Sequence, residues 1–269
     1  MRNLEITIRI LAVEKNRKER GGRCSHRLLD VLSDGPGMQG GSTESPLTFD
    51  REKAYQRVDA NSDTLFYSAP RMTGHIDSQA DEHLVSLAGE LLRPGDIVLD
   101  LMASVESHLP DGLDLQVAGL GMNSAEMTAN HRLNDFIVRD VNSKPELPYP
   151  AGFFDAVLCN LSIEYLTDPE TVIREAARIL KPSGRLLVSF SNRWFPPKVT
   201  RLWQELHEFE RLGYVLQLCR PHFNDLQSYS FRNWPRPTAD KHFPALRTSD
   251  PLYAVTGTKQ DNNTTGGLA

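Results

Sequence analysis

Three features are scarce in this sequence of 269 residues, and each shortage excludes a class of protein. Only three cysteines occur (Cys24, Cys159 and Cys219), and none has CxxC or zinc-ligand spacing, so neither a disulfide framework nor a zinc site is predicted. No apolar run approaches the roughly 18 residues that cross a bilayer. Basic residues are not in excess either, since the formal net charge is -5. Nucleic-acid-binding domains usually carry a basic face, so this class of protein is not indicated. We therefore expect a cytoplasmic protein with no membrane and no nucleic acid among its partners.

The charge that is present is unevenly distributed. Residues 1–37 hold eight Lys and Arg against five acids, which sets them apart from the rest of the chain. A targeting peptide is one interpretation, but its three glutamates (Glu5, Glu14 and Glu19) are unusual in such peptides, and organellar targeting is not favoured. We predict a weakly ordered extension over 1–45, a lid or cap segment over 46–79, an α/β domain over 80–258 and a disordered tail over 259–269.

Short apolar runs alternate with stretches of helical periodicity through the predicted domain. Strands are predicted over 96–101, 115–120, 136–140, 154–160, 185–190, 226–231 and 252–257. Helices are predicted over 78–92, 124–130, 168–180 and 197–219, the last as one long helix. Ser124 is expected to cap the second helix, Thr167 or Asp168 the third, and 181–184 are expected to end the third. This alternation predicts an α/β fold with a doubly wound, mostly parallel sheet of seven strands. A ligand is expected over the carboxyl ends of the first, second and fourth strands.

Three stretches carry a resemblance to a known family. Residues 97–104 (IVLDLMAS) have the order of a strand, an acid and a loop, residues 147–157 read LPYPAGFFDAV, and residues 177–186 read ARILKPSGRL. Together they resemble class I S-adenosylmethionine-dependent methyltransferases of the type 11 kind, over about residues 80–258. Residues 100–110 (DLMASVESHLP) and 189–193 (SFSNR) are similar to an uncharacterised methyltransferase-like subgroup. The resemblance implies a Rossmann-like methyltransferase fold and S-adenosyl-L-methionine as cofactor.

The chain departs from the family pattern at two places. The usual D-x-G-x-G-x-G loop is absent, because no glycine follows Asp100 before Gly112. Glycines in this loop let the backbone lie close to the cofactor. The second strand also lacks the terminal acid that hydrogen-bonds the ribose, and Asn123 is the nearest polar residue that could replace it.

The resemblance also implies which residues form the site. The cofactor-binding positions that it implies are Asp100, Met102 and Ser104 for the methionine portion, Asn123 for the ribose, Asp140 and Val141 for the adenine, and Asn160 and Leu161 beside the transferred methyl group. The candidate catalytic residues are His108, Asn160 and Tyr165, and no metal is expected. Other interpretations stay open: the acids could cap backbone N–H groups at strand ends, Asn123 could cap a helix, and His108 could be a buried loop histidine. Arg71 and His75 are candidates for a lid over the site.

The function that this pattern favours is methyl transfer from S-adenosylmethionine to a small-molecule acceptor, by a monomer or homodimer. The missing glycines and ribose acid keep an alternative open, namely a catalytically degenerate cofactor-binding or scaffold protein. A nucleotide-linked oxidoreductase is a weaker alternative, because the GxGxxG fingerprint is absent.

Overall fold

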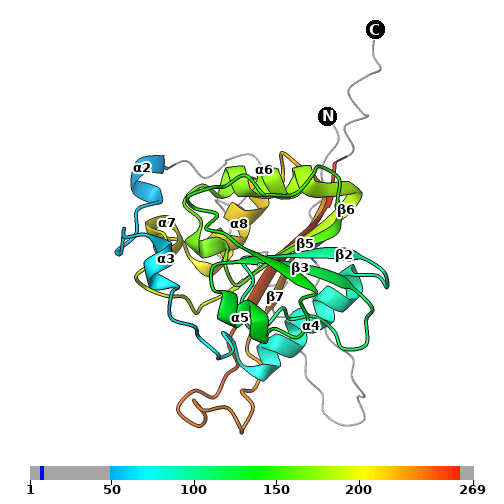
Figure 1. The fold of residues 1–269 in the computed structure, drawn as a ribbon. Coiled ribbons are helices and arrows are strands. Elements are labelled where there is room, and N and C mark those ends of the chain that lie inside the picture. The colour runs from blue at the N-terminus through cyan, green and yellow to red at the C-terminus, as the bar shows by residue number, and fades with distance from the viewer. Residues whose placement is uncertain (1–6, 9–48, 261–269) are drawn as a thin grey trace.

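The computed structural model describes residues 7–8 and 49–260, which form one sheet with helices on both faces (Figure 1). The sheet has eight strands in the order β1-β7-β8-β6-β5-β2-β3-β4. Their bounds are β1 Thr7–Ile8, β2 Ile97–Leu101, β3 Gln116–Gly121, β4 Asp135–Val138, β5 Phe154–Asn160, β6 Leu180–Ser191, β7 Phe223–Phe231 and β8 Leu252–Lys259. All seven predicted strands are present, so the α/β fold is confirmed. The short β1 adds an eighth strand, and the rest of the predicted extension and most of the tail lie outside the described residues.

Most neighbouring strands are parallel, and β8 is the exception. It lies between β6 and β7 and pairs with both in the antiparallel sense. At the centre, Leu99 of β2 lies opposite Ala118 of β3 and Val157 of β5. The chain order reverses around β2, because β3 and β4 follow on one side and β5 and β6 on the other. Ligands of open α/β sheets bind outside the carboxyl ends of the strands at such a reversal.

The helices divide between the two faces of the sheet. On one face α4 (Ser78–Leu91) buries Leu84 and Leu87, whereas α6 (Pro169–Ile179) buries Val172 and Ile173 in a separate core on the other. The remaining helices are α2 Arg51–Ala54, α3 Asp63–Phe66, α5 Ser124–Ala129, the 3-10 turn η2 Ile163–Tyr165, α7 Arg201–Glu205 and α8 Glu208–Cys219. Among the helices that the structure describes, none is long and apolar enough to cross a bilayer.

Three local predictions were wrong. The single helix over 197–219 is two, α7 and α8, because His207 is extended and its backbone N–H donates to the Glu210 carboxylate at 2.7 Å. The N-cap of α5 is Asn123 rather than Ser124, since the Asn123 amide oxygen accepts from two backbone N–H groups of the first turn. Residues 181–184 do not end a helix but belong to the irregular start of β6, where Ser183 has a φ of 56°.

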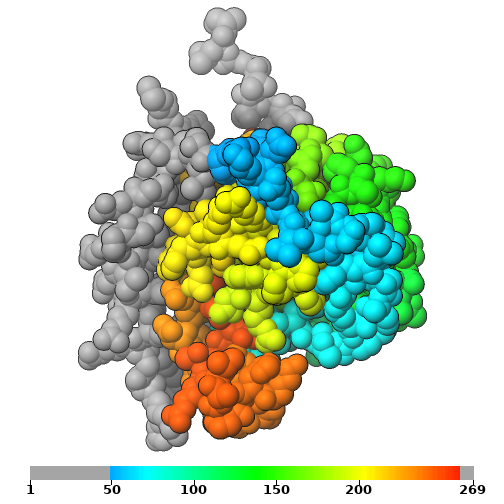
Figure 2. All heavy atoms as spheres, turned by 90° about the vertical axis from the view of Figure 1, so that its left-hand side faces the viewer, coloured from blue at the N-terminus to red at the C-terminus, as the bar shows by residue number. Residues whose placement is uncertain are grey.

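The segment from Phe49 to Asp77 lies across the domain. Figure 2 shows it in blue to cyan against the yellow region of α7. Backbone hydrogen bonds join the two, from Asp59 to Pro197 and from Arg201 to Gln56, both of 2.8 Å. This placement brings the segment to the edge of the sheet where the parallel strands end.

Candidate functional site

A cavity of about 260 Å³ lies where the parallel strands end. Its floor is made by residues at or just after the ends of β2 (102–104), β3 (121–123), β4 (139–142) and β5 (161–162). Its opposite wall comes from the N-terminal segment, from residues after β6 and from the loop between β7 and β8, namely Asp63, Tyr67, Arg71, Thr73, Gly74, His75, Arg193, Trp194, Phe195 and Lys241. The sheet reversal at β2 lies beneath it, which is the expected position for a ligand.

A second cavity of about 30 Å³, the size of a water or two, adjoins the first. Met102, Ser104 and Leu161 border both cavities, whereas Asp100 and His108 border only the small one. Asp100 is 3% exposed, and its carboxylate accepts a hydrogen bond of 2.7 Å from the Ser107 hydroxyl. Burial raises the pKa of Asp100 to about 7.

The raised pKa of Asp100 predicts a pH-dependent stability. Between about pH 4 and pH 7 the folded chain keeps a proton that the unfolded chain releases, so the free energy of unfolding falls as pH rises. The slope is on the order of 1.4 kcal/mol per pH unit inside this window. Asp100→Asn keeps an acceptor for Ser107 and removes the titration. We expect its urea midpoint to fall less than that of the wild type from acidic to neutral pH, and parallel curves would contradict the assignment.

The loop after β2 turns sharply although it has no glycine. Met102 has a φ of 64°, the left-handed conformation that glycine adopts most easily and that costs other residues about 1–2 kcal/mol. Its neighbour Ala103 donates a backbone hydrogen bond of 2.9 Å to Leu120. A Cβ atom on Gly121 would lie 2.1 Å from the Ala103 carbonyl oxygen, which leaves no room for a side chain there. The loop is therefore packed directly on the backbone at the end of β3.

Asn123 and Glu126 hold the next wall of the cavity. The Asn123 amide oxygen caps α5, and its amide nitrogen donates to the carbonyl oxygen of Tyr67 at 2.9 Å. Glu126 is 6% exposed and lines the cavity. One carboxylate oxygen accepts from the Arg71 backbone N–H at 2.7 Å and the other from the Ser104 hydroxyl at 2.6 Å. Glu126 therefore joins the N-terminal segment, the loop after β2 and α5.

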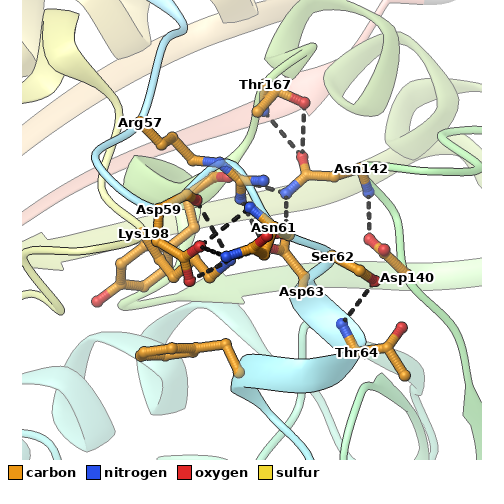
Figure 3. Close-up of polar contacts among 12 residues, drawn as sticks. Arg57, Asp59, Asn61, Ser62, Asp63, Thr64, Asp140, Asn142, Thr167 and Lys198 are labelled. Atoms are coloured by element: carbon orange, nitrogen blue, oxygen red, sulfur yellow. Dashed lines mark hydrogen bonds and ion pairs between the residues drawn. The ribbon is translucent and has the colours of Figure 1, made fainter.

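A buried charge cluster fixes the N-terminal segment over the cavity (Figure 3). Asp63 is 3% exposed and lies between two cations, Arg57 at 2.8 Å and Lys198 at 3.1 Å. Lys198 is fully buried and also pairs with Asp59 at 2.9 Å. The Asn142 amide, from the loop after β4, donates to Asp63 at 2.8 Å. Burial opposes ionisation of Asp63, but hydrogen bonds from Arg57 and Asn142 hold its pKa below the usual value.

The cavity wall beside this cluster is aromatic and holds the Arg71 guanidinium, which donates to the Phe66 carbonyl oxygen at 3.1 Å and forms no ion pair with any described residue. The Arg71 guanidinium carbon lies 4.5 Å from the Phe66 ring centroid and 5.0 Å from that of Phe195. His75 borders both cavities, and its pKa is lowered by burial and then by the nearby His108. Burial keeps the pKa of Tyr165 well above its ordinary value, so its hydroxyl stays protonated.

The structure places the residues predicted from the sequence in two groups. Those that line the large cavity are Met102, Ser104, Asn123, Asp140, Val141, Leu161 and Tyr165. Those that reach only the small one are Asp100, His108 and Asn160. The His108 ring nitrogen Nδ1 lies 2.6 Å from the Asp81 carboxylate of α4. This contact fits the other interpretation of His108, that of a buried loop histidine. The Asn160 amide oxygen accepts from Ser189, and its buried amide nitrogen has no hydrogen-bond partner among residues 49–260.

Three polar residues of the site were missed from the sequence. Glu126 follows the true N-cap of α5 by three residues, a spacing that would have marked it once Asn123 was identified as the cap. Asp63 and Lys198 are 135 positions apart, and no local pattern signals that they meet. Among the described residues, no group of three or more His, Cys, Asp or Glu side chains could hold a metal ion.

The chain is similar to proteins of known family. Residues 108–188, from the loop after β2 into β6, match the family model described as "Methyltransferase domain". The chain is 36% identical over 110 residues to a 27-O-demethylrifamycin SV methyltransferase of Amycolatopsis mediterranei, covering 37% of this chain and 40% of that protein. It is 28% identical over 151 residues to a ubiquinone/menaquinone biosynthesis C-methyltransferase of Chromobacterium violaceum, covering 52% and 59%. The chain thus spans about half the length of these curated relatives.

Solved structures are similar at lower identity. The YcgJ protein of Bacillus gives a TM-score of 0.48 at 15% identity, covering 68% of this chain and 99% of that one. Phosphoethanolamine N-methyltransferase 2 of Haemonchus contortus, in complex with S-adenosyl-L-methionine, gives 0.47 at 13% identity, covering 68% and 53%. Over residues 108–188, the match to the family model agrees with the resemblance seen in the sequence.

Proposed function

We propose that this chain, which carries a class I methyltransferase domain, binds S-adenosylmethionine in the large cavity and methylates a small-molecule acceptor. The observation that carries the proposal is the cavity itself, which runs along the ends of β2, β3, β4 and β5. Of the residues that the resemblance implies for the methionine, ribose and adenine portions, those that line this cavity are Met102, Ser104, Asn123, Asp140 and Val141, whereas Asp100 borders only the small cavity. The relatives support a small-molecule acceptor, since their names specify a rifamycin and quinones.

The residues present fit the cofactor in most respects. Residues 102–104 form one wall, and Ala103 packs directly on Gly121 there. Asp140 uses one carboxylate oxygen on the backbone N–H of Asn142, at 2.9 Å. Its other oxygen has no hydrogen-bond partner among residues 49–260 and is able to accept from an adenine amino group. The next residue, Val141, also lines the cavity.

The acceptor would lie between the cofactor and the wall formed by the N-terminal segment and residues 193–195. Bound S-adenosylmethionine supplies an electrophilic methyl group, so alignment of the nucleophile accounts for much of the catalysis. His75 is uncharged at neutral pH, because its pKa is lowered, and can take the proton that the nucleophile releases. Tyr165, stacked on Phe195 with centroids 5.9 Å apart, keeps its proton and can donate a hydrogen bond.

Calorimetric titration with S-adenosylmethionine and S-adenosylhomocysteine tests the proposal. We expect both to bind with dissociation constants in about the micromolar range, or on the order of -8 kcal/mol. Transfer of a labelled methyl group to acceptors in a panel of phenols, quinols and amines would then identify the acceptor. Absence of binding by both ligands would overturn the proposal, whereas binding without transfer to any acceptor would contradict the catalytic part of it.

A further inference from the structure

The end of β3 cannot supply a carboxylate for the ribose. Gly121 is the last residue of β3, and even a single Cβ atom there would lie 2.1 Å from the Ala103 carbonyl oxygen. The neighbouring Asn123 amide is fully committed, with its oxygen on the first turn of α5 and its nitrogen on the carbonyl groups of Tyr67 and Ser68. Any acid that recognises the ribose hydroxyls must therefore come from elsewhere.

Three carboxylates line the large cavity, and two of them have other roles. Asp63 is neutralised by Arg57 and Lys198. Asp140 follows β4 and supports its own turn through the N–H groups of Asn142 and Ser143. The third, Glu126, stands on α5 directly after β3, beside the loop after β2. It is the acid nearest in the chain to the position where the β3 carboxylate is missing.

The Glu126 carboxylate is buried and only partly satisfied. A carboxylate has about four acceptor positions, and only two are used here, by the Arg71 N–H and the Ser104 hydroxyl. No Lys, Arg or His within the described part of the chain lies close enough to form an ion pair with it. A buried charge without an ion pair is unfavourable unless further hydrogen bonds satisfy it. Two acceptor positions match the two hydroxyl groups of a ribose in number.

We propose that Glu126 accepts hydrogen bonds from the ribose hydroxyls of bound S-adenosylmethionine, in place of the carboxylate that the end of β3 lacks. The inference rests on the proposed function. Glu126 is then a cofactor-binding residue, and Ser104 and the Arg71 backbone are the groups that position it. The glycine at 121 and the position of the acid are linked. Because the Ala103 carbonyl occupies the space that a side chain at 121 would need, the carboxylate is supplied by a residue of α5 instead.

Calorimetry with S-adenosylhomocysteine and its 2′,3′-dideoxy analogue tests this assignment. Glu126→Gln keeps the size of the side chain and an acceptor for the Arg71 N–H, but removes the charge. We expect it to bind S-adenosylhomocysteine about tenfold or more weakly than the wild type, because a charge-assisted hydrogen bond is lost. The dideoxy analogue should bind both proteins with nearly equal affinity, since it has no hydroxyls to donate. Glu90→Gln, an exposed change on α4 with the same charge difference, should leave both affinities unchanged.

The outcomes separate this inference from the proposed function. If the wild type binds neither S-adenosylmethionine nor S-adenosylhomocysteine, the proposed function fails. If it binds S-adenosylhomocysteine but Glu126→Gln binds it equally well or more tightly, the role of Glu126 fails alone. If Glu126→Gln does not fold, the affinities of the wild type for S-adenosylhomocysteine and for its dideoxy analogue are compared. Equal affinities would overturn the assignment.

Discussion

Asp63→Ala is expected to lower the free energy of unfolding by about 3–5 kcal/mol, because it leaves buried cations without their partner. Arg57 loses both of its hydrogen bonds to the carboxylate. Lys198, which has no exposed surface, keeps Asp59 as its one ion-pair partner within the described part of the chain. Urea denaturation followed by circular dichroism measures the loss. Because the pKa of Asp63 is lowered in the folded chain, the wild-type advantage should disappear as pH falls below the usual range of a carboxyl group.

An exposed ion pair of the same chain is the matched control. Arg201 and Glu205 lie four residues apart at α7, and their side chains are 55% and 59% exposed. Glu205→Ala should therefore change the free energy of unfolding by about 0.5 kcal/mol or less. A similar small effect of Asp63→Ala would show that the cluster around Lys198 does not hold the N-terminal segment on the domain.

Gly121→Ala is expected to destabilise the fold by about 1–3 kcal/mol and to weaken S-adenosylhomocysteine binding at the same time. The new methyl group would meet the Ala103 carbonyl oxygen at 2.1 Å and the Met127 sulfur at 3.0 Å. The loop after β2 would have to move away from β3, and that loop forms one wall of the proposed cofactor site. Thermal unfolding and calorimetric titration measure the two effects.

Gly213→Ala provides the control for this substitution. Gly213 lies within α8, and no atom would lie within 4 Å of an added Cβ apart from its own helix and chain neighbours. Alanine is the better helix former, so the change should stabilise the protein by about 0.5–1 kcal/mol. An equal response of the two glycine variants would contradict the close packing at the end of β3.

The sheet could be predicted from the sequence because its strands are short apolar runs separated by turns. Asp168 was likewise recognised as a candidate cap of α6 from its position before Pro169. The break between α7 and α8 could not be predicted from periodicity, because Leu206 and Phe209 continue the apolar pattern across it. The break is stabilised by a hydrogen bond from the His207 backbone N–H to the Glu210 carboxylate, and the spacing of apolar residues carries no information about such a bond.

Cavity-lining residues could be predicted where they directly follow a strand. They were missed where the cavity is built by segments that are far apart in the sequence. Residues at strand ends, such as Met102 and Asp140, do line the cavity. Asp100 was expected at the cofactor, yet its side chain borders only the small cavity and bonds Ser107. A lysine such as Lys198 is normally expected at the surface, and its burial depends on acids far away in the chain.

The position of β8 has a consequence for folding during synthesis. β7 reaches the parallel part of the sheet only through β8, which is made after it and pairs with both β6 and β7. While β8 is still inside the ribosome, one edge of β6 has no partner and the apolar strand is open to pairing with other chains. We therefore expect nascent chains that end before Leu252 to require chaperones and to aggregate on release. Release of the chain with β8 complete should allow the sheet to close.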